Sequence, residues 1–153
     1  MSLILGIEYC KLDSNGRFKF PIALKRQLEN EECRFVIRPS LYGECLELWP
    51  YDSFEAEIAQ LQKELNPYSI EDRKLLRKLS AGNIVEMDTN DRIVIPTEQR
   101  GRIKTSKDLV LQSTGKFIEI WDHDTYCRMN EEESDFAERI DQRLGKAEPS
   151  AAQ

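Results

Sequence analysis

Two arginines, each four positions after an aspartate, are the residues of this sequence best suited to bind a ligand. Asp13 and Arg17 are repeated, 75 positions later, as Asp88 and Arg92. A guanidinium can form paired hydrogen bonds with phosphate oxygens or a guanine edge, and a β-hairpin fits the major groove. The alternative is an exposed hairpin ion pair, which contributes less than about 1 kcal/mol. The repetition of the spacing favours nucleic-acid binding.

The residues between the first aspartate and its arginine predict a three-residue turn joining two short strands. This turn places Gly16 where the backbone must be left-handed, a conformation that glycine adopts easily. It also sets Leu12 opposite Phe18 and Cys10 opposite Phe20, so that apolar side chains share one face. The stretch is therefore expected to form a hairpin with Arg17 at its tip, beside Asp13.

The second copy predicts the same turn with one change of residue. Asp91 stands at the position of Gly16, and aspartate tolerates the left-handed conformation better than most residues do. The expected pairs are Met87 with Ile93 and Val85 with Ile95. Because Asp91 adds a negative charge next to the second arginine, we rank Arg17 above Arg92 as a contact.

Two lysines flank the first turn and add to its positive charge. In the predicted hairpin Lys11 and Lys19 lie opposite each other and point outward, where like charges destabilise the pairing. Their placement favours a site at which phosphates neutralise them. We therefore predict as DNA-contacting residues Arg17, Lys19, Lys11, Asn15 and Arg92, and as residues that orient the turns Asp13, Gly16 and Asp88.

Composition limits the other classes of function. The chain of 153 residues is 40% hydrophobic, enough for one compact domain or two small ones. No apolar run is long enough to span a membrane, and the first nine residues do not resemble a signal peptide. The 4 cysteines show no metal-ligand spacing and there is 1 histidine, so reduced cysteines, no metal and no cofactor are expected. Without a P-loop or a nucleophile elbow, a cytoplasmic non-enzyme is the prediction.

The net charge of −6 at first argues against a nucleic-acid partner, but the charge is unevenly distributed. Residues 11–40 carry seven Lys and Arg against four Asp and Glu, and residues 87–107 carry five against three. Each of these basic segments contains one copy of the turn. An acidic chain can present a positive surface because exposed charges beyond a Debye length are largely screened.

The elements that must position the turns are also written twice. Each turn is followed by a short segment beginning at a proline and then by two strands, predicted at 34–38 and 45–49 in the first half and at 109–111 and 117–121 in the second. We expect a first repeat over 4–51, a helical linker over 52–81, a second repeat over 82–123, a C-terminal helix over 124–145 and a tail over 146–153.

The two Asp-to-Arg stretches, followed by Leu46-Glu47-Leu48-Trp49-Pro50 and by Ile118-Glu119-Ile120-Trp121, resemble the MraZ family over roughly residues 4–144. The resemblance implies an α+β fold in which two AbrB-like swapped-hairpin repeats form a pseudo-twofold barrel. It also implies a transcriptional regulator whose hairpin arginines contact double-stranded DNA. Such a protein would be nucleoid-associated. It would assemble as a homo-oligomeric ring, an octamer or larger, on direct repeats in the promoter of the division and cell-wall gene cluster.

Two other functions stay open from the sequence. One is an AbrB-type antitoxin or another protein-interaction module that uses the acidic C-terminal segment. The other is a ring-forming scaffold that does not bind DNA. Salt-dependent DNA binding separates both from the regulator, because phosphate contacts weaken steeply with salt.

Overall fold

A computed structural model describes residues 3–28, 32–103, 107–131 and 135–145. The chain forms two compact units, Met1–His123 and Asp124–Gln153. The first unit contains both predicted turns. In the described residues, no helix is long and apolar enough to cross a membrane.

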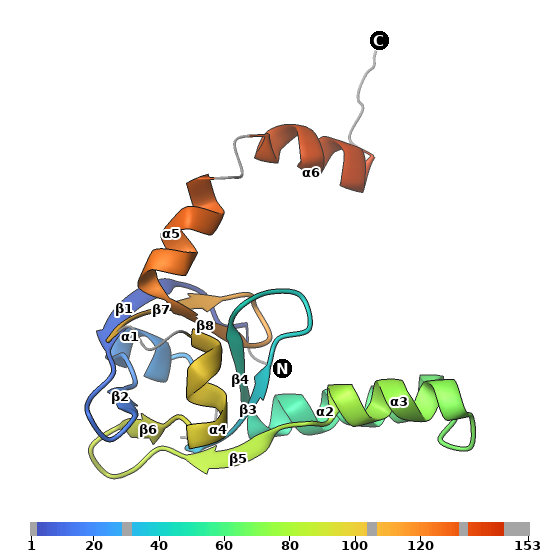
Figure 1. The fold of residues 1–153 in the computed structure, drawn as a ribbon, viewed down its shortest axis with the longest axis horizontal. Coiled ribbons are helices and arrows are strands. Elements are labelled where there is room, and N and C mark those ends of the chain that lie inside the picture. Colours follow the sequence, from blue (N-terminus) through green and yellow to red (C-terminus); the bar gives the residue numbers. More distant parts are fainter. Residues whose placement is uncertain (1–2, 29–31, 104–106, 132–134, 146–153) are drawn as a thin grey trace. The chain divides into compact units, whose positions relative to one another are not determined.

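The first unit is built on two antiparallel sheets (Figure 1). The larger sheet has six strands in the order β1-β7-β8-β4-β3-β5. Their bounds are β1 Ile7–Lys11, β3 Arg34–Pro39, β4 Leu46–Pro50, β5 Asn83–Glu86, β7 Asp108–Ser113 and β8 Ile118–Asp122. The smaller sheet pairs β2 (Arg17–Lys19) with β6 (Arg92–Val94). In both sheets, strands of the first half of the chain pair with strands of the second, which interleaves the two repeats.

The predicted hairpins are correct only next to their turns. Leu12 bridges Phe18 as expected, but Cys10 pairs with Leu109 on β7, and the expected partner Phe20 donates its N–H to the carbonyl of Asp91. An isolated two-stranded ribbon has little core to bury, whereas strands exchanged between repeats gain partners and a shared core. The swapped arrangement implied by the family resemblance is the one observed.

The second hairpin opens in the same way. Val85 pairs with Phe35 on β3 instead of with Ile95, whose N–H donates to the carbonyl of Gly16. This last bond and the bond from Phe20 to Asp91 join equivalent residues of the two repeats. The exchange is therefore reciprocal, as an approximate twofold relation between the halves requires.

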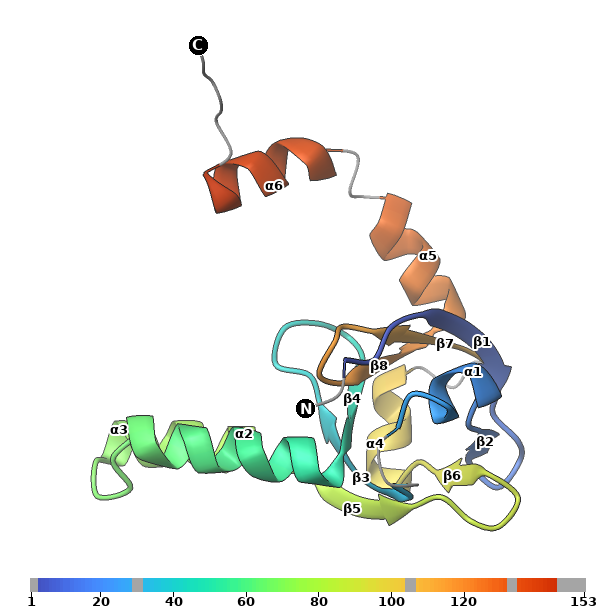
Figure 2. The same cartoon turned by 180° about the vertical axis from the view of Figure 1, so that it is seen from behind.

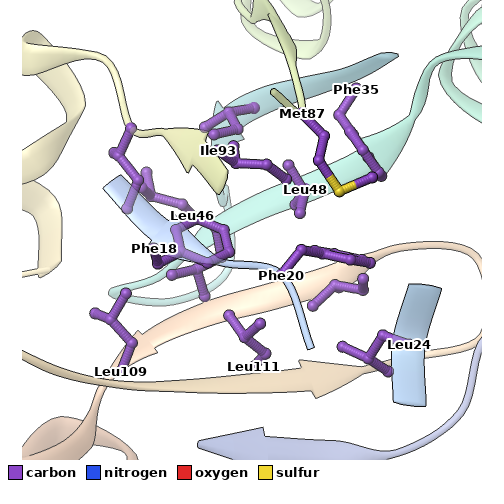
Figure 3. Close-up of a cluster of buried hydrophobic side chains, with 14 of the residues drawn as sticks. Phe18, Phe20, Leu24, Phe35, Leu46, Leu48, Met87, Ile93, Leu109 and Leu111 are labelled. Carbon is purple, nitrogen blue, oxygen red and sulfur yellow. The ribbon is translucent and has the colours of Figure 1, made fainter. Parts of the chain in front are cut away.

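The core lies between the two sheets (Figure 3). Phe18 and Ile93, which face each other in the smaller sheet, are 1% and 0% exposed. Their side chains point toward Leu46 and Leu48 of the larger sheet. Fully burying a side chain of this size contributes about 1.5–3 kcal/mol. The smaller sheet is thus held to the larger one by one face, which leaves its other face outside.

Short helices follow the two strands of the smaller sheet. α1 (Ile22–Lys25) follows β2, and α4 (Thr97–Arg100) follows β6 and continues as the 3-10 turn η2 (Gly101–Ile103). Each begins after a proline, which suits the start of a helix. α4 faces the viewer in Figure 1, and α1 does so in Figure 2, the view from behind. The two helices thus lie on opposite sides of this unit.

The predicted linker contains two helices, α2 (Tyr51–Glu64) and α3 (Ile70–Leu79). The side chain of Ser69 caps α3 by accepting a hydrogen bond from the N–H of Asp72, as helix starts of this type do. The segment predicted as a C-terminal helix contains α5 (His123–Glu131) and α6 (Phe136–Leu144). Gly145, left-handed with φ of 64°, ends α6. The predicted tail, 146–153, lies outside the described residues.

Candidate nucleic-acid interface

The outer face of the smaller sheet gathers positive side chains from both repeats. The register of β2 and β6 sets Arg17 opposite Val94 and Lys19 opposite Arg92, on either side of the buried central pair. Because side chains alternate along a strand, the flanking residues share the face that points away from the core. We call this surface the cationic face and define it by Arg17, Lys19, Arg92 and Val94. In the described part of the chain, neither Lys19 nor Arg92 forms an ion pair through its side chain.

The predicted pairing of Lys11 with Lys19 is wrong. Lys11 lies at the end of β1, which leaves the turn to pair with β7, and its Nζ is 2.8 Å from Oδ1 of Asp108. This hydrogen bond raises the pKa of Lys11. Lys19 instead lies opposite Arg92, another cation. Like charges directly opposite destabilise a strand pair, so an anion bound over this pair is favoured.

Asp13 organises the first turn through its carboxylate. Its Oδ1 accepts hydrogen bonds from the N–H groups of Asn15 at 2.8 Å and Arg17 at 2.9 Å. Its Oδ2 lies 3.3 Å from Nε of Arg17, which is the predicted ion pair at the tip. The backbone hydrogen bond from Arg17, and then the one from Asn15, hold the pKa of Asp13 below its ordinary value. The predicted left-handed conformation of Gly16 is confirmed, with φ of 78°.

Asp88 organises the second turn in the same way. Its Oδ1 accepts from the N–H groups of Asn90 at 2.8 Å and Arg92 at 2.9 Å. The predicted left-handed conformation of Asp91 is confirmed, with φ of 63°. The pKa of Asp88 is lowered first by the bond from the Arg92 backbone, with smaller effects from the positive charges of Arg17 and Arg92. The charge of Arg17 therefore acts on both turns.

Each turn also contacts the short helix of the other repeat, a contact that was not predicted from the sequence. Arg100, at the end of α4, donates from Nη2 to the carbonyl of Asn15 at 3.0 Å and from Nε to the carbonyl of Ile95 at 2.8 Å. Lys25, at the end of α1, places Nζ 2.8 Å from Oδ1 of Asp91. Lys25 and Arg100 are separated by the repeat offset of 75, which was the available signal.

The structure thus brings together most of the predicted contact residues. Arg17, Lys19 and Arg92 share the cationic face, and Asn15 is exposed in the first turn. Lys11 is held on the other sheet by Asp108. Among the described residues, no group of three or more His, Cys, Asp or Glu side chains could hold a metal ion. The arrangement presents guanidinium and ammonium groups, which bind phosphates.

Comparison with known proteins identifies relatives that match most of the chain. The family described as "MraZ protein, putative antitoxin-like" matches twice, at residues 3–78 and 79–146. A protein of Flavobacterium psychrophilum named transcriptional regulator MraZ is 34% identical over 95% of this chain and 94% of its own length. Proteins of the same name are 34% identical in Christiangramia forsetii, over 93% of each chain, and 30% identical in Treponema denticola, over 83% of this chain and 88% of that one.

The two consecutive family matches agree with the duplicated turns and with the interleaved sheets. Strands on both sides of residue 79 contribute to each sheet. Two matches that cover most of the sequence, with relatives similar over nearly their full length, show that this chain belongs to the MraZ family.

Proposed function

We propose that this protein regulates transcription by binding double-stranded DNA through the cationic face and the adjoining first turn. The observation that carries the proposal is the pairing of Lys19 with Arg92 beside Arg17, which concentrates three cations on one exposed ribbon. A two-stranded ribbon is narrow enough for the major groove. The names of the relatives, transcriptional regulator MraZ, support the regulatory part.

The chemistry of each residue sets its role in this proposal. Arg17, oriented by Asp13 through Nε, keeps its remaining N–H groups for a guanine edge or a phosphate. Lys19 and Arg92 neutralise phosphates, which also relieves their mutual repulsion. Each phosphate so neutralised steepens the salt dependence, with a slope of about −0.9 in log affinity against log salt.

We further propose that binding is sequence-specific and oligomeric. One protomer offers few contacts, whereas a homo-oligomeric ring on direct repeats multiplies them through effective concentration. The proposed site of action is the promoter of the division and cell-wall gene cluster, where the protein acts as a repressor in the cytoplasm, associated with the nucleoid. The implied partners are DNA and further copies of this chain.

A binding titration tests the proposal. Arg17→Ala lowers affinity for the upstream region of the protein's own gene by about tenfold or more, the range of a lost arginine contact. The control is Arg77→Ala, which removes an exposed arginine from α3 and keeps wild-type affinity. Light scattering checks that both variants keep the wild-type mass. Equal affinity of Arg17→Ala and wild type contradicts the proposal, and a loss of mass shows that Arg17 is structural.

A further inference from the structure

We propose that Arg100, which belongs to the second repeat but lies on the first turn, contacts DNA there. We further propose that the equivalent cation of the second turn, Lys25, does not contact DNA because it forms an ion pair with Asp91. The inference deepens the proposed DNA binding and rests on it. It assigns to the interface a cation that lies outside both Asp-to-Arg stretches. It also implies that the first turn binds DNA phosphates more strongly than the second.

The guanidinium of Arg100 lies directly on the backbone of the first turn. It bonds the carbonyl of Asn15 through Nη2 and the carbonyl of Ile95 through Nε. A Cβ added to Gly16 would lie 2.0 Å from Cζ of Arg100, so only glycine leaves room for this contact. Gly16 is accordingly buried, although Ser14 and Asn15, which precede it in the turn, are exposed. The contact places the guanidinium of Arg100 against Gly16, the residue that precedes Arg17 in the chain.

The charge of Arg100 is not neutralised by these contacts. Both acceptors are backbone carbonyls, and in the described part of the chain no carboxylate forms an ion pair with Arg100. A guanidinium has five N–H groups, of which the two bonds occupy two. The other three make no hydrogen bond within the described part of the chain, and Arg100 is partly exposed, so we assign them to a phosphate. Because the side chain is already ordered, binding loses less conformational entropy than it would with a freely rotating arginine.

The equivalent contact of the second turn has the opposite character. Lys25 occupies the position of Arg100, and Asp91 occupies that of Gly16, with 2.8 Å between Nζ and Oδ1. Here the cation is neutralised by a carboxylate within the turn itself. The same approach of a short helix to a turn therefore leaves a positive charge in one repeat and an internal ion pair in the other.

The two turns differ in the balance of positive and negative side chains around them. Arg17 and Arg100 stand against one carboxylate, Asp13, in the first turn. In the second, Arg92 and Lys25 stand against the two carboxylates of Asp88 and Asp91. The first turn is therefore the stronger site for a phosphate, and Arg92 acts mainly through the cationic face that it shares with Lys19.

The first experiment removes the charge of Arg100. Arg100→Gln is expected to reduce the slope of log affinity for duplex DNA against log salt concentration by about one in magnitude. It is also expected to lower affinity about fivefold at 0.15 M salt, as the loss of one phosphate contact predicts. Arg100→Lys keeps the charge and restores the slope, even where the lost carbonyl contacts weaken binding. A merely structural role of Arg100 would lower affinity in both variants without changing the slope.

The second experiment gives the second turn the residue types found at the equivalent positions of the first. The double variant Lys25→Arg with Asp91→Gly removes the internal carboxylate and supplies a guanidinium, and glycine suits the φ of 63° at this position. We expect tighter binding, by about fivefold or more at 0.15 M salt, and a slope steeper by at least one. The control, Lys25→Gln with Asp91→Asn, removes both charges of the ion pair and is expected to leave the slope unchanged, because the net charge of the second turn stays the same.

The outcomes separate this inference from the proposed function. If wild-type protein binds DNA, but Arg100→Gln keeps its slope and the double variant binds no tighter, the inference is overturned and the proposed function stands. If wild-type protein shows no salt-dependent binding to duplex DNA, both are overturned. If Arg100→Gln changes the oligomer mass, the double variant decides, since it leaves the first turn intact.

Discussion

Lys19 of β2 and Arg92 of β6 lie directly opposite each other, so the two repeats bring like charges together on an exposed surface. Such a pair destabilises the folded protein and is relieved when an anion binds between its members. Stability and binding therefore make opposite demands on this pair, which permits a direct test.

Replacing Lys19 by alanine is expected to leave the protein as stable or to stabilise it by about 0.2–1 kcal/mol, because the repulsion with Arg92 disappears. The same change is expected to lower affinity for duplex DNA and to reduce the salt slope by about one. Urea unfolding and a binding titration on the same preparation measure both effects. A stability loss above about 1 kcal/mol would show that Lys19 supports the fold instead.

Gly16→Ala is expected to destabilise the protein by about 1–2 kcal/mol from the left-handed backbone alone, and further because the new methyl group displaces Arg100. Gly101→Ala is the matched control. Its φ is −62° and no atom lies within 4 Å of the added Cβ, so it is expected to be neutral or stabilising by about 0.4–1 kcal/mol. Thermal unfolding compares the two. Equal melting temperatures would contradict the role given to Gly16.

Ile93→Ala tests whether the smaller sheet is held by its central pair. The side chain is 0% exposed and faces Phe18, so its truncation is expected to cost about 2–5 kcal/mol, the range for such cavities. Ile93→Val removes one methylene group and is expected to cost about 0.5–1.5 kcal/mol. The denaturant midpoints of the two variants and the wild type show whether Ile93→Ala loses more stability than Ile93→Val. Equal effects of the two variants would mean that the pair is not closely packed.

Glu119 is expected to make stability depend on pH. It lies opposite Glu47 between β8 and β4, and burial, with a smaller effect of Glu47, raises its pKa above the ordinary value. A pKa raised by folding means that the folded protein binds the proton more tightly. The resulting stabilisation is present below the unfolded pKa and is lost as pH rises through the folded pKa.

Glu119→Gln removes this titration. The amide oxygen still accepts the hydrogen bond that Nε1 of Trp121 donates to Glu119. The variant is therefore expected to be more stable than wild type at pH 7, and the difference is expected to shrink as pH falls toward the ordinary pKa of glutamate. Urea midpoints measured from pH 4 to pH 7 follow the difference. A constant difference over this range would exclude titration of Glu119 as its cause.

The sequence by itself determined the local chemistry of the turns. The carboxylates of Asp13 and Asp88, the left-handed positions of Gly16 and Asp91, and the bridge from Leu12 to Phe18 all follow from interactions within a few residues. The duplication also indicated the family, because the repeated Asp-to-Arg spacing can be recognised in the sequence alone. These features need no knowledge of what lies on the far side of the fold.

Only the tertiary structure decided which strands pair beyond the turns. Local pairing and exchange between repeats satisfy the same apolar pattern, and the larger shared core favours exchange. That choice moved Lys11 from Lys19 to Asp108 and set Lys19 opposite Arg92. It also brought the ends of α1 and α4 onto the turns of the opposite repeats. These contacts join residues more than sixty positions apart, and they form only because the repeats exchange strands. Interactions between neighbouring residues in the sequence do not determine them.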